Sequence, residues 1–84
     1  MEFQVYILQS LTTNRYYVGQ TNNLEKRLDE HNSEVAGHTK KEQPWKLVWH
    51  KTVSTRGEAL LLERKIKKRG ASRFLEDLSR SQPG

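Results

Sequence analysis

The chain has 84 residues, no cysteine and a formal net charge of +5 at neutral pH. A chain of this length buries one small core, and without cysteine it has neither a disulfide framework nor a thiolate metal site. It has no apolar stretch long enough to cross a membrane, and its first residues lack the basic start of a secretory signal. We therefore expect a soluble, cytoplasmic protein.

The charge is distributed unevenly along the chain. Residues 1–37 carry three Lys or Arg against five Asp or Glu, a balance of −2, whereas residues 38–84 carry twelve against five, a balance of +7. A basic surface that is asymmetric in this way favours a polyanionic partner, most often nucleic acid.

The first third of the chain predicts two strands and a helix. Residues 3–8 are nearly continuously apolar and β-prone, which predicts a strand covered on both faces. After a polar turn, residues 15–19 form a second strand, antiparallel because the connection is too short for a crossover. Asn22 is then expected as the N-cap of a helix, with Glu25 completing a capping box, and the helix should run to about Ser33.

This helix carries polar side chains at its apolar stripe. At about 100° per residue, His31 falls within the stripe formed by Leu24 and Leu28, and Arg27 borders it. A polar group facing a core needs a partner, an opening to solvent or a function. His31 is thus either a core histidine satisfied by a backbone carbonyl or a functional residue. Arg27 is either the surface partner of Glu30 or a functional residue.

A basic loop and a third strand follow. Residues 34–44 contain glycine, proline and several charges, so we expect a loop in which His38, Lys40 and Lys41 either contact phosphate or belong to a solvated linker. Residues 45–53 predict a strand.

Apolar and polar residues alternate along this third strand. Leu47 and Trp49 should lie on one face, and Val48 and His50 on the other. We assign its tryptophans to packing and His50 to the surface.

A second long helix is predicted over residues 56–69. Thr55 is the expected N-cap, with Glu58 at the third helical position, and Gly70 is the expected stop. Residues 71–80 could form a short third helix with an apolar face of Phe74, Leu75 and Leu78.

Glu63 lies within the apolar arc of the second helix, beside Ala59 and Ile66. A carboxylate there is costly to bury unless a cation or hydrogen-bond donors meet it. It could pair with Arg27 or a lysine, form a surface pair with Lys67 four residues on, or bind a hard divalent ion.

The element order ββαβα(α) predicts an α+β fold, a three-stranded antiparallel sheet flanked by helices. We expect a single domain over residues 1–80 and a flexible tail over residues 81–84.

Two tyrosine motifs and three later residues occur in a spacing that resembles the GIY-YIG nuclease family. The first motif is Gln4-Val5-Tyr6 and the second is Tyr17-Val18-Gly19, with Arg27, His31 and Glu63 matching the helix positions. Gln4 stands in place of a glycine and Val18 in place of an isoleucine. The resemblance covers about residues 3–70 and is strongest to small stand-alone bacterial members, which are similar to the N-terminal nuclease domain of excinuclease C.

The resemblance implies metal-dependent hydrolysis of phosphodiester bonds. Glu63 would hold one Mg²⁺ or Mn²⁺ ion, and Arg27 would stabilise charge on a phosphate oxygen. Tyr6 would take a proton from the attacking water, which requires a lowered pKa. Tyr17 would orient phosphate or water, and His31 would share in proton transfer or hold Tyr6 in place.

The remaining assignments concern the substrate. Gly19 would let backbone and substrate approach closely, and His38, Lys40, Lys41 and Lys67 are assigned to substrate binding. The substrate is expected to be DNA in a repair or recombination context, and a protein partner could supply targeting.

Two alternatives stay open. One is a nucleic-acid-binding module or nuclease accessory protein that has the fold but does not cut. The other is a zinc protein using His31, His38 and His50, although these three lack a recognisable ligand spacing.

Overall fold

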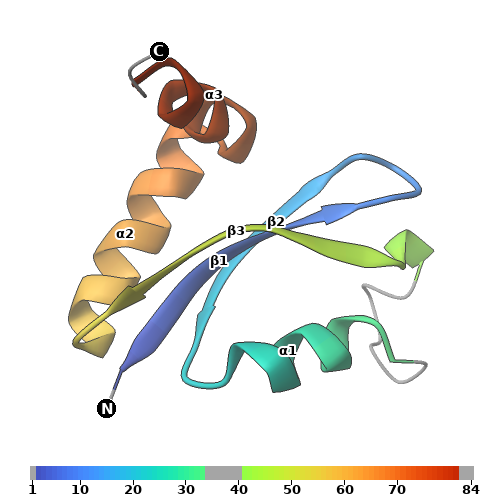
Figure 1. The fold of residues 1–84 in the computed structure, drawn as a ribbon, viewed down its shortest axis with the longest axis horizontal. Helices are drawn as coiled ribbons and strands as arrows, with labels where there is room; N and C mark the ends of the chain where they lie inside the picture. Colours follow the sequence, from blue (N-terminus) through green and yellow to red (C-terminus); the bar gives the residue numbers. More distant parts are fainter. Residues whose placement is uncertain (1, 34–40, 82–84) are drawn as a thin grey trace.

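The computed structural model describes residues 2–33 and 41–81. The α+β order predicted from the sequence is confirmed (Figure 1). The elements are β1 Phe3–Ser10, β2 Tyr16–Thr21, α1 Leu24–His31, β3 Trp45–Val53, α2 Arg56–Arg69 and α3 Ala71–Ser81. His38 and Lys40 lie outside the described residues, as do most of the predicted loop and residues 82–84 of the predicted tail. No helix in the described ranges is long and apolar enough to cross a membrane.

The three strands form one antiparallel sheet in the order β2-β1-β3. Because β1 is central, both of its backbone edges are paired, and β2 and β3 are edge strands. Tyr6, in the middle of β1, lies opposite Gly19 of β2 and His50 of β3. The first tyrosine motif therefore lies directly beside the second.

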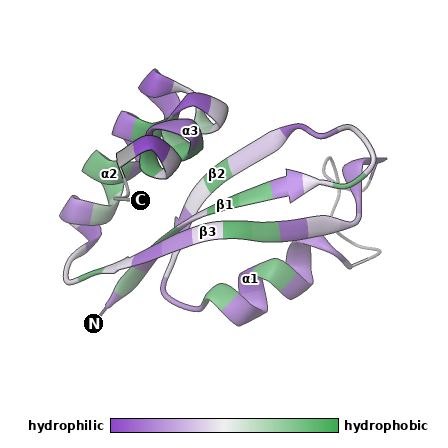
Figure 2. Ribbon diagram, turned by 45° about the horizontal axis from the view of Figure 1, so that its top comes forward, coloured by the Kyte–Doolittle hydropathy of each residue, from purple (hydrophilic) through white to green (hydrophobic). Residues whose placement is uncertain are grey.

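Helices cover both faces of the sheet, with α1 on one side and α2 and α3 on the other (Figure 2). Alternate residues of β1 point to opposite faces. Val5 and Ile7 pack with Ala59 and Ile66 of α2, whereas Tyr6 and Leu8 pack with Trp45 on the α1 side. The expectation that the first strand is covered on both faces is confirmed.

The alternation predicted for β3 is wrong. Ile7 pairs with Trp49 but the next residue, Leu8, pairs with Leu47, so Val48 is an extra residue in a β-bulge. Leu47 consequently packs against the α1-side cluster and Trp49 against the α2-side cluster. The bulge lets one strand contribute large side chains to both layers.

The helix cap of α1 is Asn23 rather than the predicted Asn22. The side chain of Asn23 accepts a hydrogen bond from the Lys26 amide at 3.1 Å. Thr21 Oγ1 accepts a hydrogen bond from the Asn23 amide, also at 3.1 Å, and this fixes the turn one residue later than expected. The predicted capping box of Asn22 and Glu25 is therefore not formed.

α1 also ends earlier than the predicted Ser33, at His31. The side chain of Asn32 pairs with the backbone of Trp45, accepting from its amide at 2.7 Å and donating to its carbonyl at 3.1 Å. This exchange ties the end of α1 to the start of β3.

α2 and α3 follow the sequence prediction closely. Thr55 caps α2 by accepting from the Glu58 amide at 3.2 Å, and Gly70 ends it with a φ of 94°. A positive φ of this size favours glycine. Phe74 and Leu75 of α3 then pack on the α2-side core.

Candidate active site

The Tyr6 side chain lies over Gly19 of β2, the residue opposite it in the sheet, which has no side chain. Tyr6 is only 2 % exposed. A Cβ at Gly19 would lie 2.7 Å from the Tyr6 hydroxyl oxygen and 2.9 Å from its Cζ. The absence of a side chain at Gly19 thus makes room for the Tyr6 ring over β2, the edge strand. Close approach of substrate at Gly19 stays a prediction; the group that the structure places against Gly19 is the Tyr6 ring.

An aromatic cluster surrounds this ring. The ring centroids of Tyr17 and His31 are 4.6 Å apart in an edge arrangement, and each lies 6.4 Å from that of Tyr6. The ring centroid of Trp45 lies 6.1 Å from those of Tyr17 and His31. His31 is buried at 8 % exposure, so the structure places the α1 histidine within the tyrosine cluster. Such packing restricts the rotamers of all four rings.

Arg27 lies at the rim of the cluster. Its side chain is 48 % exposed, and its Nε lies 3.8 Å from Glu30 Oε1, the surface pairing left open by the sequence. Arg27 also lines a cavity of about 220 Å³ together with Arg56, the first residue of α2. Sequence reasoning missed Arg56, because only the fold brings the start of α2 beside α1.

Glu63 forms the i,i+4 pair that was one of three open interpretations. Its side chain is 18 % exposed, and Oε2 lies 2.7 Å from Lys67 Nζ. No group of three or more His, Cys, Asp or Glu side chains that could hold a metal occurs within residues 2–33 and 41–81. A single, partly exposed carboxylate could hold a divalent ion only if that ion kept most of its waters, and Glu63 Oε2 would have to exchange its contact with Lys67 for the ion.

Several of these residues affect the pKa of the Tyr6 hydroxyl. Burial raises the pKa of Tyr6 well above its ordinary value, and Tyr17 adds to the effect. Arg27 lowers the pKa, whereas Glu63 and Glu30 raise it. In the protein without a metal ion, desolvation of the phenolate outweighs the guanidinium, so the lowered pKa required for proton transfer near a metal stays a prediction. Arg27 of α1 and Glu63 of α2 thus act on the Tyr6 hydroxyl with opposite sign.

Other residues considered in the sequence analysis can also be placed. Lys41 is exposed before β3, and His50 is exposed on β3 as expected. Gln4, which replaces the glycine of the first motif, has a buried Oε1 without a hydrogen-bond partner in the described part of the chain.

Comparisons with known proteins identify the family of this chain. The model of the GIY-YIG catalytic domain matches residues 2–76. A UPF0213 protein of Bacillus licheniformis is 37% identical over 68 residues, covering 76% of this chain and 70% of the relative. A UPF0213 protein of Syntrophus aciditrophicus is 40% identical over 74 residues, covering 86% and 84%.

The fold is also similar to a solved structure. The solution NMR structure of a UPF0213 protein from Bacillus halodurans matches with a TM-score of 0.59 and 26% identity, covering 96% of this chain and 86% of the other. With a family model that spans most of the chain, and with two relatives of comparable length, the chain belongs to the GIY-YIG nuclease family.

Proposed function

We propose that this protein is an endonuclease that hydrolyses phosphodiester bonds of DNA, using one Mg²⁺ or Mn²⁺ ion, in repair or recombination. Membership of the family supports nuclease activity on nucleic acid. The observation that carries the proposal is the packing of the buried Tyr6 ring against the rings of Tyr17 and His31, with Arg27 and Glu63 near enough to act electrostatically on its hydroxyl. Packing alone does not require a cation and a carboxylate near a phenol.

The divalent ion belongs at Glu63 in this proposal. When bound there, it supplies positive charge for the phosphoryl oxygens. Lys67 Nζ holds the carboxylate at 2.7 Å in the structure. If a divalent ion binds the Glu63 carboxylate, the Lys67 ammonium would be available to a substrate phosphate. This supports the assignment of Lys67 to substrate binding.

Arg27 is proposed to bind a phosphate oxygen and stabilise the charge that develops on it. Its 3.8 Å contact with Glu30 is long and exposed, and contacts of this kind contribute little to stability. The guanidinium can therefore leave Glu30 for a phosphate at small cost. Arg56 lines the same cavity and would add a second cation beside it.

Tyr6 is proposed to hold the attacking water. With its raised pKa it keeps its proton in this structure and acts as a hydrogen-bond donor. To accept a proton from water its pKa must fall, and Arg27 is the described group whose charge acts in that direction. Tyr17 would orient the phosphate, and His31 would hold both phenols in place through its ring contacts.

The test is cleavage by the purified protein of supercoiled plasmid and labelled DNA, with Mg²⁺, with Mn²⁺ and with chelator. Glu63→Gln should lower the rate at least about 100-fold, because the acceptor for the ion is lost. Glu58→Gln is the matched control on the same helix, exposed in the first turn, and should keep the wild-type rate. Undiminished cutting by Glu63→Gln would exclude the metal assignment. Salt-sensitive binding without any cutting would favour the non-catalytic binding module.

A further inference from the structure

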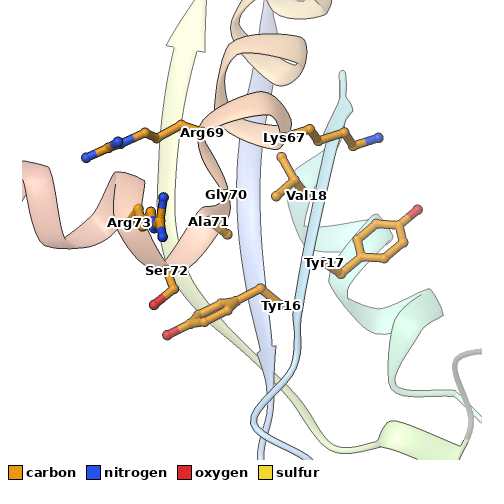
Figure 3. A pocket seen from close by; sticks show the side chains of 9 residues that line it. All are labelled: Tyr16, Tyr17, Val18, Lys67, Arg69, Gly70, Ala71, Ser72 and Arg73. Atoms are coloured by element: carbon orange, nitrogen blue, oxygen red, sulfur yellow. The ribbon is translucent and has the colours of Figure 1, made fainter.

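A second, larger cavity lies between β2 and the junction of α2 with α3. Its volume is about 640 Å³, within the usual range of small-molecule sites and large enough for a nucleotide. Side chains from three elements line it (Figure 3): Tyr16, Tyr17 and Val18 from β2, and Lys67, Arg69 and Arg73 from the helices.

Tyr16 gives the cavity an aromatic wall. Successive residues of a strand point to opposite faces, so Tyr16 and Val18 share the α2 side while Tyr17 points to the α1 side. Figure 3 shows this split, with Tyr16 directed toward Ser72 and Tyr17 directed away. Tyr16 is 37 % exposed, although large apolar rings are usually covered. An accessible ring in a hollow is a surface on which a base can stack.

Arg73 gives the cavity an available cation. Arg69 is already forked onto Asp77, with contacts of 2.8 and 2.9 Å, and Lys67 contacts Glu63. Arg73 makes no ion pair or hydrogen bond with any residue of the described ranges. Its side chain is exposed at the start of α3 (Figure 3). A guanidinium placed this way suits a phosphate group.

The cavity borders the candidate active site. Tyr17 and Lys67 line it, and both also contact residues of that site: Tyr17 through the rings of Tyr6 and His31, and Lys67 through Glu63. A strand whose reacting phosphate lies beside Tyr17 and the Glu63–Lys67 pair can thus place a neighbouring nucleotide beside Tyr16.

We propose that this cavity binds one unpaired nucleotide adjacent to the phosphate that is cut, its base stacked on Tyr16 and its phosphate on Arg73. Within a duplex the faces of a base are covered by its neighbours, so only an unstacked base can present a face to Tyr16. The substrate class is accordingly nucleic acid with a single-stranded stretch at the cut. This assignment rests on the proposed nuclease function for its meaning, but its binding test does not.

The test measures fluorescence anisotropy of the wild-type protein in chelator, so that no cutting occurs. The probes are labelled DNA oligonucleotides of about 20 residues, single-stranded and duplex, with RNA of the same sequence as a third arm. We expect single strands to bind about tenfold more tightly than duplex, and Tyr16→Leu and Arg73→Gln each to remove most of that preference. The RNA arm reports which sugar the cavity accepts.

The matched controls are Tyr16→Phe, which keeps a stacking ring, and Arg80→Gln, an exposed cation on α3 that lies outside the cavity lining. Both should retain the wild-type preference for single strands. Because Tyr16 and Arg73 are exposed, the variants should unfold at the wild-type temperature. Equal affinities of wild-type protein for single strands and duplex would overturn the assignment, as would an unchanged preference in Tyr16→Leu and Arg73→Gln.

Cleavage separates this inference from the proposed function. If the wild-type protein cuts, and the two variants cut single-stranded and duplex DNA as it does, the nuclease stands and the cavity assignment fails. If the wild-type protein cuts nothing with either metal, but both variants lose its preference for single strands, the nuclease proposal fails and the cavity is confirmed as a nucleotide site.

Discussion

The two faces of the sheet differ in what their side chains do, although one strand supplies both. Toward α2 the residues of β1 are Val5 and Ile7, which are fully buried with Ala59 and Ile66. Toward α1 they are Tyr6 and Leu8, and around Tyr6 lie a second phenol and an imidazole. The first face is a conventional apolar core. The second buries side chains that can bind and transfer protons.

The difference shows how a domain of this size accommodates a site. Burial of aliphatic side chains on one face supplies stability, so the opposite face can bury two phenols and an imidazole. The two faces come together at β2, an edge strand of the sheet. There Tyr6 passes over Gly19 on one side, and Glu63 and Lys67 approach from α2 on the other.

The largest expected effect lies on the apolar face. Ile66→Ala should lower the free energy of unfolding by about 3 kcal/mol, because it opens a cavity in a fully buried cluster. Leu61→Ala, on the same helix but 68% exposed, is the control and should change it by less than about 0.5 kcal/mol. Urea denaturation measures both. Similar losses in the two variants would show that this face is not the main source of stability.

Gly19→Ala probes the point where the two faces meet. The added Cβ would lie 2.7 Å from the Tyr6 hydroxyl oxygen, and the buried ring would have to move. We expect a loss of about 1–3 kcal/mol in the free energy of unfolding, together with a fall in cleavage rate.

Gly57→Ala is the matched control, since the nearest atom to its added Cβ is Thr55 Oγ1 at 3.9 Å. It should be neutral or slightly stabilising. Removing the hydroxyl in the double variant Gly19→Ala, Tyr6→Phe should recover part of the lost stability. No recovery would mean that the Gly19 contact with Tyr6 is not the cause.

Tyr6→Phe should have the smallest effect on stability at neutral pH and a specific effect at alkaline pH. Because the folded pKa of Tyr6 is raised, the unfolded chain releases this proton first, above pH of about 10. The unfolded chain then binds fewer protons than the folded chain, so stability falls as pH rises. The loss attributable to Tyr6 approaches about 1.4 kcal/mol per pH unit.

Denaturation of the wild type and of Tyr6→Phe between neutral and alkaline pH measures this difference. Tyr16→Phe is the control and should retain the alkaline loss, because Tyr6 is still present. Parallel pH profiles for the wild type and Tyr6→Phe would contradict the raised pKa.

The sequence by itself determined the element order, the covered central strand, the ends of α2 and the resemblance to the family whose model matches the chain. These features are local. Apolar periodicity, capping residues and motif intervals are set by residues close together in the chain.

The tertiary structure decided the rest. The bulge at Val48 and the partners of Asn32 depend on which strand lies opposite, and a single stretch of sequence does not record that. The raised pKa of Tyr6 follows from desolvation by the packed cluster, although the sequence argument considered only the neighbouring charges.

The cavity beside Tyr16 has the same origin. It joins β2 to the α2–α3 junction, two segments about 50 residues apart in the chain, and neither carries a motif for it. Local sequence specifies which groups are present, whereas long-range packing specifies their solvent exposure and their neighbours. Those two properties decide what the groups can bind and when they ionise.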